Sequence, residues 1–269
     1  PQAQRTRIEE RARWEAQVLG RIGRIPGILS ADQPFTDEAG IVLPMEHFSG
    51  ISLTTWIEKF GPNATPAQGQ IRPDLKSRTD LWMKIATALD ESHRQGVVHR
   101  LLRPEVILVQ NRPDPQEIRI TGFDLAKQLS TDATIASTSI GDDRLAFAAP
   151  EVVMAFSSAE PASDQFSLGA LLALLLTGKP LFDHSRQLLT SHRMVRRVKD
   201  VSPRIPLSLD EVVDRMLKLR PTERYASLEE AIQAVEDGRD PQRRTLPGLE
   251  LPKSDGLDPD NLLPHTRLG

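Results

Sequence analysis

The chain has 269 residues, of which 39% are hydrophobic, 26% are charged and 4% are aromatic, and it contains no cysteine. Its 34 Lys and Arg residues against 37 Asp and Glu residues leave a formal charge of −3. A near-neutral chain with few aromatic rings is unlike a nucleic-acid binder. The lack of cysteine excludes disulfides, thiolate zinc sites and cysteine nucleophiles, and it fits the reducing cytoplasm, where we place the protein.

Hydrophobic periodicity predicts a helix over residues 5–22, followed by β-like segments near residues 28–35 and 41–47. A hairpin turn is expected between these segments, at residues 37–40. From there helices dominate. We expect them at residues 52–59, 74–95, 151–156, 162–177, 183–197, 207–218 and 227–236, with one short strand at 117–121.

Two segments are polar and lack periodicity. Residues 128–143 are rich in Ser and Thr, and we expect a mobile loop there. Residues 238–269 carry Pro, Asp and Gly throughout, which is typical of a linker.

The longest apolar run, residues 166–176, is too short to span a bilayer, so we expect a buried core helix and no membrane association.

Four stretches, in order along the chain, resemble landmarks of the protein kinase family, in particular the bacterial Ser/Thr kinases. Residues 98–108 (VHRLLRPEVIL) resemble the catalytic loop, and residues 120–126 (ITGFDLA) stand where the D-F-G motif belongs. Residues 149–151 (APE) match the end of the activation segment, and residues 163–169 (SDQFSLG) resemble the start of the central buried helix. Arg224 takes the place of the arginine that pairs with the A-P-E glutamate.

The front of the chain resembles part of the small lobe of this family. Residues 15–19 (EAQVL) resemble its regulatory helix, with Glu15 in the place of the ion-pair glutamate. Residues 43–48 (LPMEHF) resemble the hinge between the lobes. In the family, the glycine-rich loop and the strand that carries the ATP-binding lysine precede the regulatory helix. We therefore interpret the chain as a piece of a longer protein, without the start of the small lobe.

The resemblance implies an α+β, protein kinase-like fold, with a truncated small lobe of a helix and β-strands and a mainly helical large lobe. We expect residues 1–48 to form the partial small lobe and residues 49–237 to form the large lobe. Residues 238–269 would then link the large lobe to a further domain.

Three positions depart from the kinase pattern in a way that bears on chemistry. Leu101 replaces the catalytic carboxylate, Val106 replaces a magnesium-binding amide, and Gly122 replaces the acid of D-F-G. A leucine cannot accept a proton, and magnesium prefers oxygen ligands. We therefore expect no catalytic residue and no metal site, with these three residues lining one cleft beneath Met45.

The residues that shape the kinase fold are retained. The resemblance implies that His99 and Phe123 stack inside the protein, and that Asp164 holds the backbone of the catalytic loop. It also implies a partly buried ion pair between Glu151 and Arg224.

Nucleotide could still dock at the hinge, because backbone groups hold adenine there in this family. The chain requires no cofactor under this interpretation, and ATP is an optional ligand that binds without a proper magnesium site. The cofactor-binding candidates are Glu15, Met45, Glu46, Phe48, Arg103 and Leu108.

The residues that shape the kinase fold are retained, whereas the catalytic and magnesium-binding residues are replaced. This combination indicates a catalytically inactive protein kinase-like domain, a pseudokinase, with a regulatory or scaffolding role. One alternative is a divergent active Ser/Thr kinase that uses Asp124 and Arg103 in an altered geometry. A second alternative is a protein-interaction module that binds no nucleotide.

The expected partners are other domains of the same chain. Residues 261–269 (NLLPHTRLG) resemble the lead-in to a glycine-rich loop in bacterial Ser/Thr kinases, which suggests an adjacent active kinase domain. An ordinary linker is the alternative. The hydroxyl groups of residues 128–143 stand where phosphorylation orders the segment in this family, and a flexible polar loop is the simpler explanation.

Overall fold

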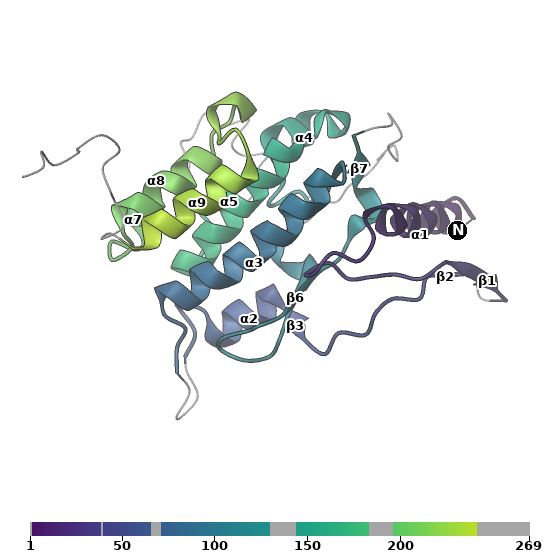
Figure 1. Ribbon diagram of the computed structural model, residues 1–269, viewed down its shortest axis with the longest axis horizontal. Coiled ribbons are helices and arrows are strands. Elements are labelled where there is room, and N and C mark those ends of the chain that lie inside the picture. Colours follow the sequence, from purple (N-terminus) through teal and green to yellow (C-terminus); the bar gives the residue numbers. More distant parts are fainter. Residues whose placement is uncertain (1, 39, 66–70, 130–143, 183–195, 241–269) are drawn as a thin grey trace, which may run out of the picture.

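The computed structural model describes residues 2–38, 40–65, 71–129, 144–182 and 196–240. The described residues form two unequal parts (Figure 1). Helix α1 (Gln2–Ile22) and the hairpin of β1 (Phe35–Asp37) and β2 (Gly40–Val42) lie on one side, and a helical body lies on the other. This arrangement is the protein kinase-like α+β fold that the resemblance implied.

Helix α1 confirms the helix predicted over residues 5–22 and begins three residues earlier. Its second half is anchored in the core by Val18, Leu19 and Ile22. Its first half is far more open, and Ile8 is 59% exposed. The helix is therefore held to the body mainly through its last two turns.

The hairpin turn predicted at residues 37–40 is confirmed, because Asp37 pairs with Gly40 in the β1–β2 register. The flanking strands are much shorter than predicted. Ile28 and Ala31 make only isolated bridges, to Ile120 and Met45 respectively. Two prolines interrupt these segments, at positions 34 and 44, and a proline has no N–H to donate to a ladder.

The helices of the body agree closely with those predicted. Ser52, Asp74 and Ser227 cap the first turns of three of them by accepting a backbone N–H. The predicted helix at 183–197 lies outside the described residues except for its last two residues, which are not helical. The described helices are α2 (Leu53–Phe60), α3 (Leu75–Arg94), α4 (Pro150–Met154), α5 (Pro161–Thr177), α7 (Val198–Val201), α8 (Leu207–Met216) and α9 (Leu228–Arg239).

Helix α5 is the centre of the body, and α3, α8 and α9 pack around it (Figure 1). Because it is apolar on every side, it is buried over most of its length, as predicted. The indole N–H of Trp82 donates to the carbonyl of Leu168 at 2.8 Å and ties α3 to α5. Gly169 lets α8 approach closely, since a Cβ there would lie 2.7 Å from the Cβ of Met216. None of the described helices is both long and apolar enough to cross a bilayer.

Two small sheets lie against helices α2 and α3 of the body. Strands β3 (Ile51–Ser52), β5 (Ile107–Val109) and β6 (Ile118–Ile120) form an antiparallel sheet in the order β3-β5-β6. Strand β4 (Val97–Val98) pairs with β7 (Lys127–Gln128), so the loop predicted from residue 128 starts later than expected. Four 3-10 turns complete the described elements: η1 (Pro104–Val106), η2 (Phe123–Leu125), η3 (Phe156–Ser158) and η4 (Pro221–Glu223).

Candidate functional site

Asp164, in the first turn of α5, holds the backbone after β4. Its two carboxylate oxygens accept the backbone N–H groups of His99 at 2.8 Å and Arg100 at 2.7 Å. His93 lies 2.8 Å from the same carboxylate. Burial raises the pKa of Asp164, but hydrogen bonds from His93 and the backbone outweigh it and hold the pKa below its ordinary value. This buried charge therefore braces the loop, as the resemblance implied.

His99 forms the expected internal stack with Phe123. Their ring centroids lie 4.7 Å apart in an edge-on arrangement. The Nε2 atom of His99 lies 2.9 Å from the carbonyl oxygen of Thr121, which requires it to carry the proton. Complete burial lowers the pKa of His99, so the ring is neutral and acts as a packing group.

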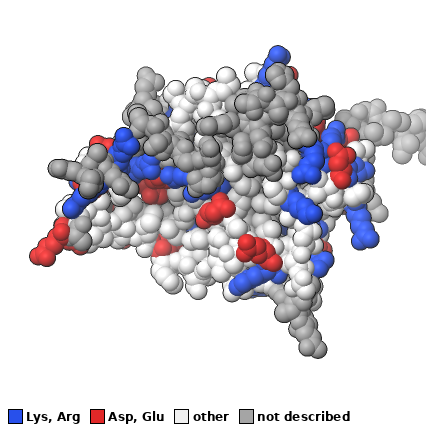
Figure 2. All heavy atoms as spheres, turned by 180° about the vertical axis from the view of Figure 1, so that it is seen from behind, with Lys and Arg blue, Asp and Glu red and all other residues white. Residues whose placement is uncertain are grey.

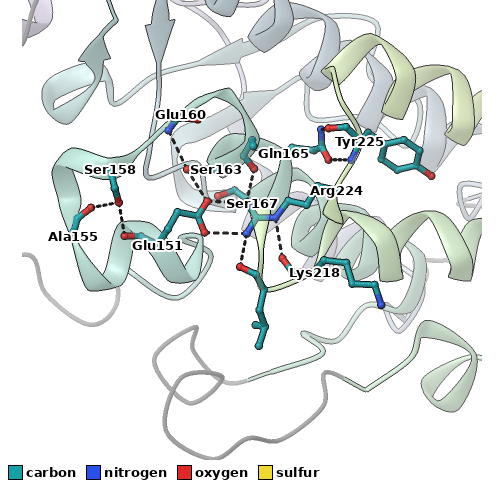
Figure 3. A network of polar contacts seen from close by, with 12 residues as sticks. Glu151, Ala155, Ser158, Glu160, Ser163, Gln165, Ser167, Lys218, Arg224 and Tyr225 are labelled. Atoms are coloured by element: carbon teal, nitrogen blue, oxygen red, sulfur yellow. Dashed lines mark hydrogen bonds and ion pairs between the residues drawn. The ribbon is translucent and has the colours of Figure 1, made fainter. Parts of the chain in front are cut away.

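The pair of Glu151 and Arg224 is confirmed and belongs to a larger network (Figure 3). The guanidinium donates to both carboxylate oxygens, at 2.8 and 2.9 Å. The hydroxyl of Ser163 donates to the same carboxylate at 2.8 Å. Burial raises the pKa of Glu151, but the hydrogen bonds and the positive charge of Arg224 outweigh this effect. The pKa of Glu151 therefore lies below its ordinary value. The network ties α4 to α5 and η4.

The two positions that supply magnesium ligands in the family carry Val106 and Gly122 here, and these two residues lie side by side. Gly122 has a left-handed backbone with φ of 81°, and a Cβ there would lie 2.9 Å from Cγ1 of Val106. Val106 is only 6% exposed. Neither side chain offers an oxygen, so these residues do not fit the Mg²⁺ that the kinase resemblance implies. Within the described residues, no three His, Cys, Asp or Glu side chains gather into a metal-binding group.

The expectation of one cleft beneath Met45 is wrong. Leu101 is 1% exposed and belongs to the hydrophobic core. The groove beside Met45 has a volume of about 520 Å³, and residues 24–32 and Arg119 line it instead. Apolar side chains are more stable in the core than at a water-filled cleft, which is consistent with the burial of Leu101.

Glu15 faces η2 and approaches the backbone where the D-F-G acid would stand. The backbone N–H of Phe123 donates to its carboxylate at 3.0 Å. Burial, followed by the negative charge of Asp124, raises the pKa of Glu15 to about 7. The neighbouring Trp14 donates its indole N–H to the carbonyl of Ala126 at 2.9 Å. Two adjacent residues therefore seat α1 on η2.

Asp124 is engaged by a residue that the sequence did not single out. Nη2 of Arg144 lies 2.9 and 3.2 Å from its two carboxylate oxygens. Both side chains are about one fifth exposed, at 18% for Asp124 and 22% for Arg144. The carboxylate that the active-kinase alternative requires is thus neutralised by an arginine.

Four of the six binding candidates gather around Arg119 of β6. Its guanidinium lies 2.7 Å from the carboxylate of Glu46 and 5.0 Å from the ring centroid of Phe48. Arg119 also stands opposite Leu108 in the β5–β6 register, on the face that turns away from the core. Met45 precedes Glu46 and completes the group. Among the described residues, the carbonyl of Glu46 and the N–H of Phe48 have no hydrogen-bond partner.

The other two candidates lie elsewhere. Glu15 is on the backbone of η2, and Arg103 lies beside Glu105, with Nε 3.5 Å from its carboxylate. Arg103 also reaches the carbonyl of Leu101 at 3.4 Å. The structure therefore separates the four candidates around Arg119 from the other two. Glu15 contacts the backbone of η2, and Arg103 lies within the catalytic-loop segment.

Two residues of the site escaped sequence reasoning. Arg119 had a usable signal, since the alternation Ile118-Arg119-Ile120 places it on the face opposite to the core. Arg144 had none, because no periodic element surrounds it and its partner is 20 residues away.

Comparisons with known proteins agree with this geometry. A family model described as a protein kinase domain matches residues 1–235. The serine/threonine-protein kinase PknK of Mycobacterium bovis is 29% identical over 265 residues, which cover 93% of this chain and 22% of PknK. PknH of Mycobacterium tuberculosis is 29% identical over 88% of this chain and 36% of its own length. The chain thus spans about a fifth of PknK and about a third of PknH.

Solved structures share the fold at lower identity. A crystal structure of the Mycobacterium tuberculosis PknI kinase domain has a TM-score of 0.62 at 23% identity. The match covers 83% of this chain and 76% of that domain. Together with the family model, the motif order and the braced catalytic-loop backbone, this leads to one conclusion. The chain belongs to the protein kinase domain family.

Proposed function

We propose that the chain is a pseudokinase domain that regulates or scaffolds a larger protein. The observation that carries the proposal is the pairing of Val106 with Gly122 at the two positions where magnesium ligands would be needed, so close that a Cβ on Gly122 would lie 2.9 Å from the Val106 methyl. Phosphoryl transfer from ATP consists mainly of positioning and charge neutralisation, and it depends on those ions. Without their oxygens the reaction loses its principal electrostatic support.

The third replacement acts in the same direction. The family orients the substrate hydroxyl with a carboxylate, and removing a general base costs roughly 10²–10⁴ in rate. Leu101 offers no oxygen and is buried in the core. Asp124 is the nearest carboxylate along the chain to the D-F-G position, and Arg144 occupies it at 2.9 Å.

Transfer of labelled phosphate from ATP by the natural full-length protein tests the proposal. We expect no transfer with either Mg²⁺ or Mn²⁺. Asp124→Ala is the control variant, since it removes the one carboxylate that a divergent mechanism would use. Phosphate transfer by the wild type that disappears in Asp124→Ala would overturn the proposal.

The matched gain-of-function variant carries Leu101→Asp, Val106→Asn and Gly122→Asp together. The Val106 change is needed because a Cβ at Gly122 would otherwise lie 2.9 Å from its methyl. We expect this variant to bind Mg²⁺ together with ATP, provided that it folds, which circular dichroism checks.

ATP binding at the hinge is part of the proposal. The carbonyl of Glu46 and the N–H of Phe48 supply the acceptor and donor that an adenine edge requires, and Leu108 lies on the same open face of the sheet. We expect a thermal shift with millimolar ATP that is unchanged by Mg²⁺ and lost in Leu108→Glu. No shift at all would favour a protein-interaction module instead.

A divergent active Ser/Thr kinase is the second candidate. The names of the relatives PknK and PknH favour it, since both are called serine/threonine-protein kinases. Their identity to this chain is 29%, and the activity of the whole protein does not follow from it.

The proposed partners are other domains of the same protein in the cytoplasm. Residues 261–269, which prompted the suggestion of an adjacent kinase, lie outside the described residues. On the face shown in Figure 2, Lys and Arg side chains are mixed with Asp and Glu side chains. Such a mixed surface is suited to protein contacts rather than to a nucleic-acid backbone.

A further inference from the structure

The segment from Ala155 to Ala159 follows α4 and contains the turn η3. None of the three residues of η3 is buried. Phe156 packs against the hydrophobic core and Ala159 is fully buried, whereas Ser157 and Ser158 are exposed and depend on polar contacts. Two cations, Arg100 in the catalytic-loop segment and Lys127 of β7, donate to carbonyls of this segment. The hydroxyl of Ser158 adds bonds to the carbonyls of Glu151 and Ala155.

Arg100 is the first cation. Its guanidinium lies 4.2 Å from the ring centroid of Phe156 and donates to the carbonyl of the same residue at 3.2 Å. A second nitrogen donates to the carbonyl of Ala126 at 2.8 Å. Burial lowers the pKa of Arg100 to about 10, which leaves it charged near neutral pH.

The backbone of Arg100 is fixed as firmly as its side chain. Its φ is 73°, a conformation that residues other than glycine adopt only when their surroundings enforce it. The N–H of Arg100 donates to Asp164 at 2.7 Å. The backbone from which the Arg100 side chain starts is therefore held in place.

Lys127 is the second cation. Its ammonium group donates to the carbonyl of Ser157 at 2.7 Å and to that of Ala159 at 2.9 Å. Lys127 is paired with Val98 in the β4–β7 sheet, two residues before Arg100. Lys127 in β7 and Arg100, two residues after β4, therefore reach the same segment, and they bind the carbonyls of Phe156, Ser157 and Ala159.

A phosphate on the hydroxyl-rich residues 128–143 would need free cations in order to fix the segment that follows. Arg100 and Lys127 are bonded to carbonyl oxygens, and Arg144 is bonded to Asp124. We propose that Arg100 and Lys127 form a permanent clamp on residues 155–159, so that this segment is docked without phosphorylation. The proposal holds whether or not the domain transfers phosphate.

Hydrogen exchange of the unphosphorylated protein tests the clamp. The reporting amides are those of Ala155 and Ser158, which are bonded to Glu151 and Ala155 respectively. After phosphatase treatment, checked by mass spectrometry, we expect both amides to remain protected in the wild type. Lys127→Met keeps the aliphatic stem but removes the donors, and we expect exchange about tenfold faster or more.

Three controls define the outcome. Lys127→Arg restores donors and should restore protection, and Lys59→Met removes an exposed lysine that lies 3.4 Å from Asn111, far along the chain from the clamp, and should change nothing. Protection of α5 reports that each variant is folded. The clamp is refuted if the phosphatase-treated wild type exchanges at Ala155 and Ser158 as fast as Lys127→Met does.

Discussion

Two regions of the molecule, a polar frame around the catalytic loop and a closed centre in and beside it, differ in which charged and polar groups they retain. The polar frame, made of Asp164, Glu151 and Arg224, keeps every charge and bonds each of them. The closed centre, made of Leu101, Val106 and Gly122, has no charge left. The frame supports the backbone, whereas the groups that the centre lacks would have served only chemistry.

The physical reason for this difference is the cost of burial. A buried carboxylate with bonded neighbours stabilises the fold, and its removal leaves unpaired donors behind. A carboxylate that waits for a metal ion has no such partner, and replacing it by hydrocarbon relieves strain and repulsion. A domain that no longer needs the reaction can therefore lose the second kind of group while it must keep the first.

The largest effect is expected in the polar frame. Asp164→Asn removes the charge that accepts the N–H groups of His99 and Arg100, and we expect it to lower the free energy of unfolding by about 3–5 kcal/mol. Urea unfolding measures this. Asp214→Asn, on a partly exposed aspartate that pairs with Lys218 near the surface, is the matched control and should cost less than about 1 kcal/mol. Equal losses in the two variants would remove the basis of the comparison.

A slightly smaller loss is expected when the frame is opened at its other end. Arg224→Met leaves the Glu151 carboxylate without its cation, at a cost of about 3 kcal/mol. Arg220→Met changes an arginine whose side chain is 82% exposed and should be nearly neutral. Combining Arg224→Met with Glu151→Gln should recover part of the loss, and a strictly additive double variant would contradict the pairing.

The stability of the protein should depend on pH through Glu15, which lies at the edge of the closed centre. Because the pKa of Glu15 rises from 4.5 to about 7 on folding, the folded protein binds more protons in this window. The contribution of Glu15 to stability should be greatest below about pH 4.5 and should fall by roughly 2–3 kcal/mol as the pH rises to about 7. Glu15→Gln should remove this part of the pH dependence. An unchanged profile in that variant would show that Glu15 does not carry the effect.

The smallest effect concerns the contact inside the centre. Gly122→Ala adds a methyl 2.9 Å from Cγ1 of Val106 at a φ of 81°, and we expect a loss of about 1–3 kcal/mol. Gly20→Ala is the control, because nothing lies within 4 Å of its Cβ and alanine favours a helix. Adding Val106→Ala to Gly122→Ala should recover the steric part only. Thermal unfolding of the three variants measures both contributions.

Most helices of the body were predicted from the sequence, because the spacing of apolar residues in a long helix indicates which of its faces is buried. Helix α5 was expected as a buried core helix from its apolar run, and α3 from its apolar stripe. The strands were predicted less well, since Ile28 and Ala31 pair through single bridges that depend on distant residues.

The sequence identified the hinge and catalytic-loop residues of the candidate site, but neither their grouping nor the two arginines Arg119 and Arg144. The hinge residues were identified, yet their meeting around Arg119 results from a register between β5 and β6 that no local pattern contains. The partner of Asp124 was missed because Arg144 lies 20 residues further along the chain and no local pattern links the two. The burial of Leu101 reflects packing from many elements and could not be read from its neighbours in the sequence.

The magnesium dependence of ATP binding tests the central claim most directly. Calorimetric titration of ATP into the natural full-length protein, with Mg²⁺ and with EDTA, should give the same affinity in both. The variant with Val106→Asn and Gly122→Asp should acquire a magnesium-dependent component. An ATP affinity of the wild type that rises about tenfold or more with Mg²⁺ would contradict the account, because the closed centre would then hold a metal ion after all.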